Sequence, residues 1–182
     1  KAENAQLKAA LANNAATNTP TQAGDTKTCH WCKESIKVVA QICKHCGKNP
    51  SSPSAQAIEK VIRKKLRKPT GELTKADFEK VTKLDLNAYQ LTDVGWLENL
   101  TRLKSLHLTV NPLTDVTGLE KLTQLKVLHL FNNQLTKPPE GLEKLTQLKS
   151  LSLNDNQLTD VKGLEKLTQL KRLYLNNNKL TN

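Results

Sequence analysis

The sequence contains no methionine, and only 3% of its 182 residues are aromatic. Its apolar fraction of 37% is low for a compact globular domain. The longest apolar stretch in a charge-poor window, Ile36 to Ile42, is far shorter than the roughly 20 residues that a membrane-spanning helix needs. The low aromatic content excludes an aromatic-rich core, and no membrane-spanning helix is visible in the sequence. Any core has to be built from the leucines that recur through the second half of the chain.

The net charge of +11 is concentrated in the first part of the chain. Residues 1–69 contain 13 Lys or Arg against four Asp or Glu, whereas residues 70–182 contain 15 against 13. A basic segment of this kind fits an anionic partner such as nucleic acid or a phospholipid surface. Unpatterned surface lysines give the same sum without any partner. Nucleic-acid association through the basic residues of the cysteine-containing segment 29–48 and of the helix predicted in residues 56–80 is therefore our second hypothesis.

Composition divides the first 80 residues into four segments. Residues 1–28, rich in Ala, Asn, Thr and Gln, predict a flexible tail. Residues 29–48 hold a cysteine cluster, and residues 49–55 have the Pro and Ser content of a linker. Residues 56–80 predict a basic amphipathic helix followed by a short second helix with Thr74 as its N-cap.

One pattern then recurs five times over residues 81–182: KLDLNAYQLTDV, SLHLTVNPLTDV, VLHLFNNQLTKP, SLSLNDNQLTDV and RLYLNNNKLTN. The first leucine of each L-x-L is its framework leucine. These are Leu84, Leu106, Leu128, Leu151 and Leu173, spaced by 22 or 23 residues. That period lies within the range of leucine-rich repeats and outside the ranges of helical repeats.

Each L-x-L predicts a short strand whose leucines point to one side, because side chains alternate along a strand. One repeat cannot bury its leucines alone, so stacked repeats have to cover one another. Asn111, Asn133, Asn156 and Asn178 lie five residues after their framework leucines, where the chain turns and leaves backbone groups unpaired. An amide side chain supplies two donors and an acceptor, which predicts a ladder of asparagines. The first repeat has Tyr89 there, so the ladder should be broken or absent at that position.

The repeats resemble the internalin-type leucine-rich repeats of bacteria, and TKADFEKVTKLDL with the preceding basic helix resembles the helical cap that opens such domains. The resemblance covers about residues 56–182. It implies a protein partner on the concave sheet, no catalytic residues and no small-molecule substrate. The family usually has a C-terminal cap, and the sequence stops at Asn182 in the turn of a repeat without one, so we expect the chain to be a fragment.

The side chains between the leucines are predicted to line the concave sheet. The candidate partner-binding residues are Asp85, His107, Thr109, His129, Phe131, Ser152, Asn154, Arg172, Tyr174 and Asn176. Phe131 is the most informative, because an exposed aromatic beside two histidines resembles the anchors of binding patches; an accidental exposed aromatic is the other interpretation. His107 and His129 should be neighbours on adjacent strands, and we interpret them as solvated imidazoles rather than as metal ligands.

All four cysteines fall in two CxxC pairs, Cys29 with Cys32 and Cys43 with Cys46. Four thiolates close a tetrahedral structural zinc site, which leaves no open position for catalysis. Two disulfides or a dithiol redox site are the alternatives, and the absence of CxxCH excludes haem attachment. The segment CHWCKESIKVVAQICKHCGK resembles the zinc-ribbon modules of many bacterial proteins, although Trp31 departs from that pattern. The resemblance implies an adaptor role.

The predicted fold class is therefore an α/β repeat, a leucine-rich-repeat solenoid with short parallel strands and a helical N-terminal cap, plus a small zinc-ribbon module. The predicted function is non-enzymatic protein binding. We expect the chain to be cytoplasmic, or exported or membrane-tethered if a segment precedes Lys1.

Metal analysis of the chain purified under reducing conditions should find about one zinc ion per molecule, lost on treatment with a strong chelator. Cys46→Ser should lose the zinc, whereas His45→Ala should retain it, because the histidines are not needed as ligands. A chain purified without reductant that contains no zinc and shows no free thiols would instead establish the two disulfides.

Overall fold

The computed structural model describes residues 26–28, 35–37 and 52–181. Strands β1 (Thr26–Thr28) and β2 (Ser35–Lys37) form an antiparallel pair in which Lys27 is opposite Ile36. The remaining elements are helices α2 (Pro53–Leu66) and α3 (Lys75–Glu79), strands β3 (Lys83–Asp85), β4 (Ser105–His107), β5 (Val127–His129), β6 (Ser150–Ser152) and β7 (Arg172–Tyr174), and 3-10 turns η1 (Gly95–Asn99), η2 (Leu119–Lys121), η3 (Leu142–Lys144) and η4 (Leu164–Lys166).

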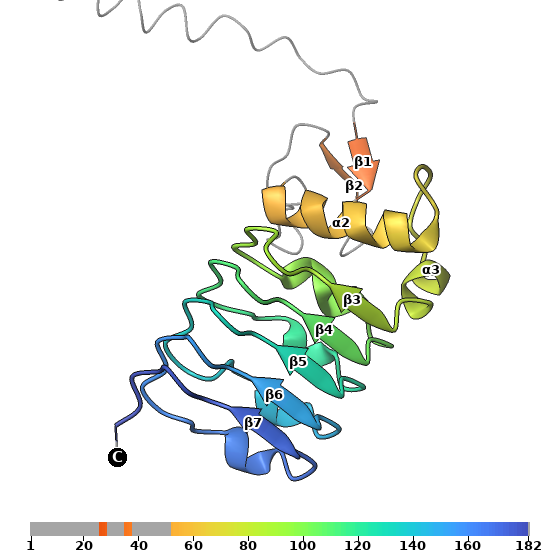
Figure 1. The fold of residues 1–182 in the computed structure, drawn as a ribbon. Helices are drawn as coiled ribbons and strands as arrows, with labels where there is room; N and C mark the ends of the chain where they lie inside the picture. Colours follow the sequence, from red (N-terminus) through yellow and green to blue (C-terminus); the bar gives the residue numbers. More distant parts are fainter. Residues whose placement is uncertain (1–25, 29–34, 38–51, 182) are drawn as a thin grey trace, which may run out of the picture.

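Strands β3 to β7 form one parallel sheet in chain order, with the 3-10 turns behind it (Figure 1). The register aligns the five framework leucines across the sheet. Leu106, Leu128 and Leu151 are completely buried, as the alternation of side chains predicted. Leu173 on β7 is 42% exposed, because β7 has a neighbouring strand on one side only within the described residues.

The repeated sequence GLEKLTQLK forms the back of the solenoid. In its first copy Leu119, Leu122 and Leu125 are all buried, so each repeat contributes leucines from its turn as well as from its strand. The glycine that opens each copy has a positive φ, which is 78° at Gly141. A Cβ on Gly141 would lie 2.6 Å from Cβ of Glu120 in the preceding repeat, so this turn can stack on the preceding one only with glycine at position 141.

Helix α2 begins at Pro53, inside the stretch 49–55 that composition suggested was a linker. The reason is a local cap: the Ser52 side chain accepts a hydrogen bond from the Ala55 amide at 3.1 Å, and proline suits the first helical position. The same Pro and Ser content that suggests a linker therefore starts a helix. The helix ends at Leu66, followed by Arg67 in the left-handed conformation.

The two helices are fixed to the first repeat. Helix α2 lies across the end of the sheet beside β3 (Figure 1), with Ile58 and Ile62 completely buried in the common core. Its Ser54 hydroxyl accepts a hydrogen bond from the Thr92 amide at 3.0 Å. On α3, Phe78 packs edge-on against Trp96 of η1 with 5.4 Å between ring centroids. The helices thus cover leucines that would otherwise face water.

The predicted asparagine ladder is confirmed, and its bonds run toward the preceding repeat. Asn133 accepts a hydrogen bond from the Leu113 amide at 3.2 Å and donates to the Leu108 carbonyl at 3.0 Å, both one repeat earlier. It also donates to the Leu130 carbonyl of its own repeat at 3.0 Å. Asn111, Asn156 and Asn178 repeat this arrangement. Tyr89 of the first repeat is 46% exposed, which fits its absence from the ladder.

Asn133→Ala should lower the free energy of unfolding by about 3 kcal/mol, because a buried amide and two buried carbonyls lose their partner. Gln134→Ala is the matched control, since Gln134 is exposed, and it should change stability by less than about 0.5 kcal/mol. Urea unfolding of the three proteins measures the difference. Equal midpoints for the two variants would show that the ladder does not stabilise the fold.

The Asp77 carboxylate holds the segment before β3 together. It accepts hydrogen bonds from Lys68 Nζ at 2.7 Å, from the Thr74 amide at 3.0 Å and from the Thr74 hydroxyl at 2.9 Å. Led by the bond from Lys68, these partners hold the pKa of Asp77 well below its ordinary value. Folding therefore favours the ionised carboxylate, and protonation in acid removes that stabilisation.

Asp77→Asn should lower the melting temperature at pH 7, where the native carboxylate is fully ionised. The difference between wild type and variant should shrink as the pH falls below about 4, where the unfolded carboxyl protonates and the native one no longer gains from ionisation. Thermal melts at pH 7, 5 and 3 check this. A gap that stays constant with pH would show that the carboxylate charge contributes nothing.

Candidate partner-binding face

The sheet brings the predicted binding residues to one surface, which we call the sheet face. The last position of the strands aligns Asp85, His107, His129, Ser152 and Tyr174 in one row. Hydrogen bonds between neighbouring repeats continue past the strand ends, from the Val110 amide to the Phe131 carbonyl at 2.9 Å and from the Asn132 amide to the Asn154 carbonyl at 3.1 Å. The row beyond the strands therefore contains Asn87, Thr109, Phe131, Asn154 and Asn176. Arg172 lies at the start of β7.

The residues of the sheet face differ in how much surface they offer. Tyr174 is 47% exposed, and Phe131, His107 and His129 are half-buried. Ser152 is only 8% exposed, contrary to the expectation of an open column, because its small side chain lies between His129 and Tyr174 in the register. Ser150 is buried in the same way. The larger side chains around β6 therefore supply the surface there.

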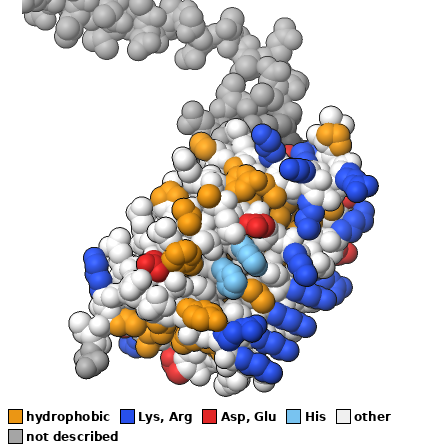
Figure 2. Space-filling view, viewed as in Figure 1, with side chains coloured by type: hydrophobic (Ala, Val, Ile, Leu, Met, Phe, Trp, Pro, Cys, Tyr) orange, Lys and Arg blue, Asp and Glu red, His pale blue; other side chains and the backbone are white. Residues whose placement is uncertain are grey.

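His107 and His129 lie side by side, as expected from the register. Their ring centroids are 4.6 Å apart with the planes tilted by 41°, and the two rings form a pair on the sheet face (Figure 2). The Ser105 hydroxyl lies 3.1 Å from Nε2 of His107. Burial, and then the nearby His107 and Arg172, lower the pKa of His129. The lowered pKa favours the neutral form of the His129 imidazole, and the two rings present flat surfaces side by side. The rings are half-buried rather than freely solvated.

Two exposed apolar residues beside this face were not among the binding residues predicted from the strand pattern. Tyr89 and Val110 are both 46% exposed, in the turns that follow β3 and β4. Val110 has a φ of 56°, a strained conformation for a β-branched residue. The corresponding residues of the other repeats are Ala88, Asn132, Asp155 and Asn177. Aligning the repeats at this position would have shown Val110 as the exception.

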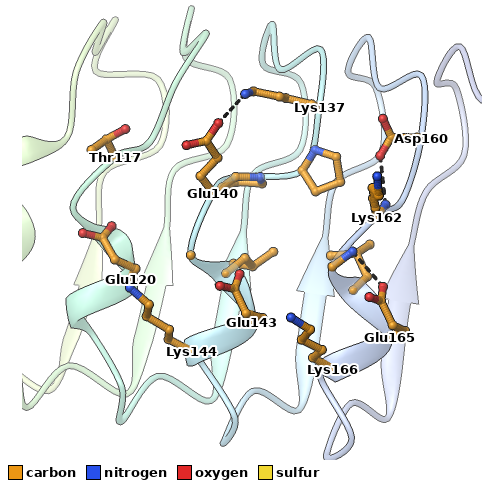
Figure 3. A pocket seen from close by; sticks show the side chains of 16 residues that line it. Thr117, Glu120, Lys137, Glu140, Glu143, Lys144, Asp160, Lys162, Glu165 and Lys166 are labelled. Atoms are coloured by element: carbon orange, nitrogen blue, oxygen red, sulfur yellow. Dashed lines mark hydrogen bonds and ion pairs between the residues drawn. The ribbon is translucent and has the colours of Figure 1, made fainter.

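The opposite side of the solenoid has a different character. A shallow hollow there is lined by charged side chains from η2, η3, η4 and the loops before them (Figure 3). Five carboxylates and four lysines line it, with Lys137 bonded to Glu140 at 2.5 Å. Within the described ranges, no group of three or more His, Cys, Asp or Glu residues is placed to hold a metal ion.

The four cysteines predicted to bind zinc, Cys29, Cys32, Cys43 and Cys46, lie outside the described residues. In the sequence, the described strands β1 and β2 flank the first cysteine pair. β1 ends directly before Cys29, and β2 begins three residues after Cys32. Of the helices that the structure describes, none is both long enough and apolar enough to cross a membrane.

Comparison with known proteins agrees with the repeat architecture. The family described as "Leucine Rich repeats (2 copies)" matches residues 79–121, 123–156 and 146–182. No curated protein sequence matches the chain significantly.

Solved structures give the same result. An internalin from Listeria monocytogenes is 34% identical with a TM-score of 0.55, over 59% of this chain and 32% of the internalin. A leucine-rich-repeat protein from Leptospira interrogans is 33% identical with a TM-score of 0.55, over 60% of this chain and 29% of that protein. The matched region thus spans about a third of the length of these relatives.

The family matches, taken together, cover more than half of the sequence and coincide with the five-stranded parallel sheet. This chain belongs to the leucine-rich-repeat family.

Proposed function

We propose that the chain is a non-enzymatic binding module that recognises a protein partner on the sheet face. The observation that carries this proposal is the cluster of aromatic and apolar side chains on an otherwise polar sheet. Phe131 shares a backbone hydrogen bond with Val110, and the His107 and His129 rings lie one row away. Large rigid side chains surrounded by polar ones are the composition of an interface hot spot.

The size and rigidity of the sheet face suit a protein ligand. Five strands at roughly 4.8 Å spacing give a surface about 20 Å across, enough for a peptide or the edge of one domain. Its backbone is fixed by the hydrogen bonds between repeats, so little ordering entropy is lost when a partner binds. Leucine-rich-repeat proteins generally mediate protein–protein interactions, which supports the same function.

The cysteine segment has a second, structural role in this proposal. We propose that Cys29, Cys32, Cys43 and Cys46 hold a zinc ion that folds a small adaptor module. Its support is the antiparallel pairing of β1 with β2, because the residues joining these strands include the first CxxC pair. A chain segment this short has no room for a hydrophobic core and needs a metal or disulfides to fold. Cysteines kept as zinc-bound thiolates suit a reducing compartment, so we propose a cytoplasmic location.

Phe131→Ala should weaken partner binding about 30-fold, the effect of removing a hot-spot side chain worth about 2 kcal/mol. Tyr174→Ala should weaken it less, because Tyr174 lies at the end of the row. Proteins captured by wild type and variants are compared by quantitative mass spectrometry, and affinity is then measured with the purified partner.

Val161→Ala is the control for this experiment, since Val161 is 41% exposed but lies outside the sheet face. Circular dichroism has to show that all variants remain folded. A partner that survives Phe131→Ala and Tyr174→Ala, or that is lost equally with Val161→Ala, would show that the sheet face is not the binding site.

A further inference from the structure

One lysine precedes the strand of each repeat after the first, and these lysines lie next to one another in a row. Backbone hydrogen bonds join them directly: the Lys126 amide donates to the Lys104 carbonyl at 2.8 Å, the Lys149 amide to the Lys126 carbonyl at 2.9 Å, and the Lys171 amide to the Lys149 carbonyl at 2.9 Å. All four residues are exposed. The row is thus a consequence of repeat stacking, with one ammonium group per strand spacing of roughly 4.8 Å.

The row continues past the first repeat onto the helical end. Lys83 begins β3, beside the backbone that pairs with Lys104, and it lines a small hollow together with Lys65 of α2. The Lys and Arg side chains form a band along the edge where the strands begin (Figure 2). We call Lys65, Lys83, Lys104, Lys126, Lys149 and Lys171 the lysine row.

None of the six forms an ion pair with a carboxylate of the described residues. The opposite side of the same repeats behaves differently. There Lys121 pairs with Glu98, and Lys137 pairs with Glu140. The repeated GLEK motif also places a glutamate directly before its lysine. Like charges at strand spacing repel one another, and a polyanion that follows the row relieves this repulsion.

The surroundings of the lysine row select among polyanions. The exposed large apolar residues of the described chain are Tyr89, Val110, Val161, Leu173, Tyr174 and Leu180, and none of them belongs to the row or directly precedes a strand. A protein partner needs such anchors, and single-stranded nucleic acid needs aromatic side chains on which bases stack. The phosphate backbone of a duplex needs only cations at its surface.

We propose that the lysine row is a binding surface for the phosphate backbone of double-stranded nucleic acid, independent of its base sequence. From β3 to β7 the row spans roughly 19 Å at the usual strand spacing, the axial length of roughly six base pairs. The flexible lysine side chains can reach the neighbouring phosphates of one strand. The row borders the sheet face, because Lys65 and Lys83 line a hollow together with Asp85 and His107. Lys65 is its one member from the basic segment 1–69 that suggested nucleic-acid binding from sequence alone.

The test measures binding of fluorescein-labelled duplex DNA of about 20 base pairs to the full chain by anisotropy, between 50 and 200 mM salt. Lys126→Gln/Lys149→Gln should weaken binding at least tenfold and make the plot of log Kobs against log salt less steep by about 2, since each lost phosphate contact removes about 1. Two duplexes of unrelated sequence should bind alike.

Lys144→Gln/Lys166→Gln is the matched control, because it removes the same charge from exposed lysines on the 3-10 side. This control should bind like wild type. Equal weakening of both double variants would overturn the proposal, since net charge alone would then explain binding. It would also be overturned if wild type failed to bind the duplex at 50 mM salt, or if heparin or phosphatidylserine vesicles bound through the row while the duplex did not. Neither result would affect the sheet-face proposal, which uses other residues.

Discussion

Each repeat of this solenoid leaves backbone groups of its turn unpaired until the asparagine of the following repeat reaches them. The amide of Asn133 bonds to Leu113 and Leu108 of the preceding repeat and to Leu130 of its own, and three other asparagines do the same. A flat sheet of three-residue strands would have few hydrogen bonds to fix its register. The buried amide adds a directional contact that holds each leucine layer over the next.

The same constraint explains how one short repeated sequence produces surfaces with different properties. Because register is fixed, each position of the repeat becomes a row. The leucine positions form the core, the variable positions between them form the sheet face, and the lysine position forms a charged edge. Variation is concentrated where the chain meets solvent between leucines, while the core and the edge stay nearly constant from repeat to repeat. A binding site on the sheet face can therefore change without altering the lysine row.

Much of this architecture could be predicted from spacing, because leucine period and asparagine position both report on stacking. The cap at Thr74 and the burial of Leu106 and Leu128 follow directly from local rules. Other features depend on neighbours that the pattern does not reveal. Ser152 is covered by larger residues of adjacent strands, and α2 begins early because Ser52 and Pro53 favour a helix start as well as a loop. The left-handed Val110 is likewise set by the turn geometry common to all repeats and not by its own preference.

The direction of the asparagine bonds has a further consequence. A repeat in the middle of the array completes the one before it and is completed by the one after it. The first repeat is completed by Asn111 in the same way, and its Thr92 amide also donates to Ser54 of α2. The repeats in the middle of the array are therefore interchangeable. A whole repeat can be gained by genetic duplication or lost by deletion without leaving a buried polar group unpaired. Each gained repeat would widen the sheet face by one strand and add one cation to its border, so the two surfaces grow together.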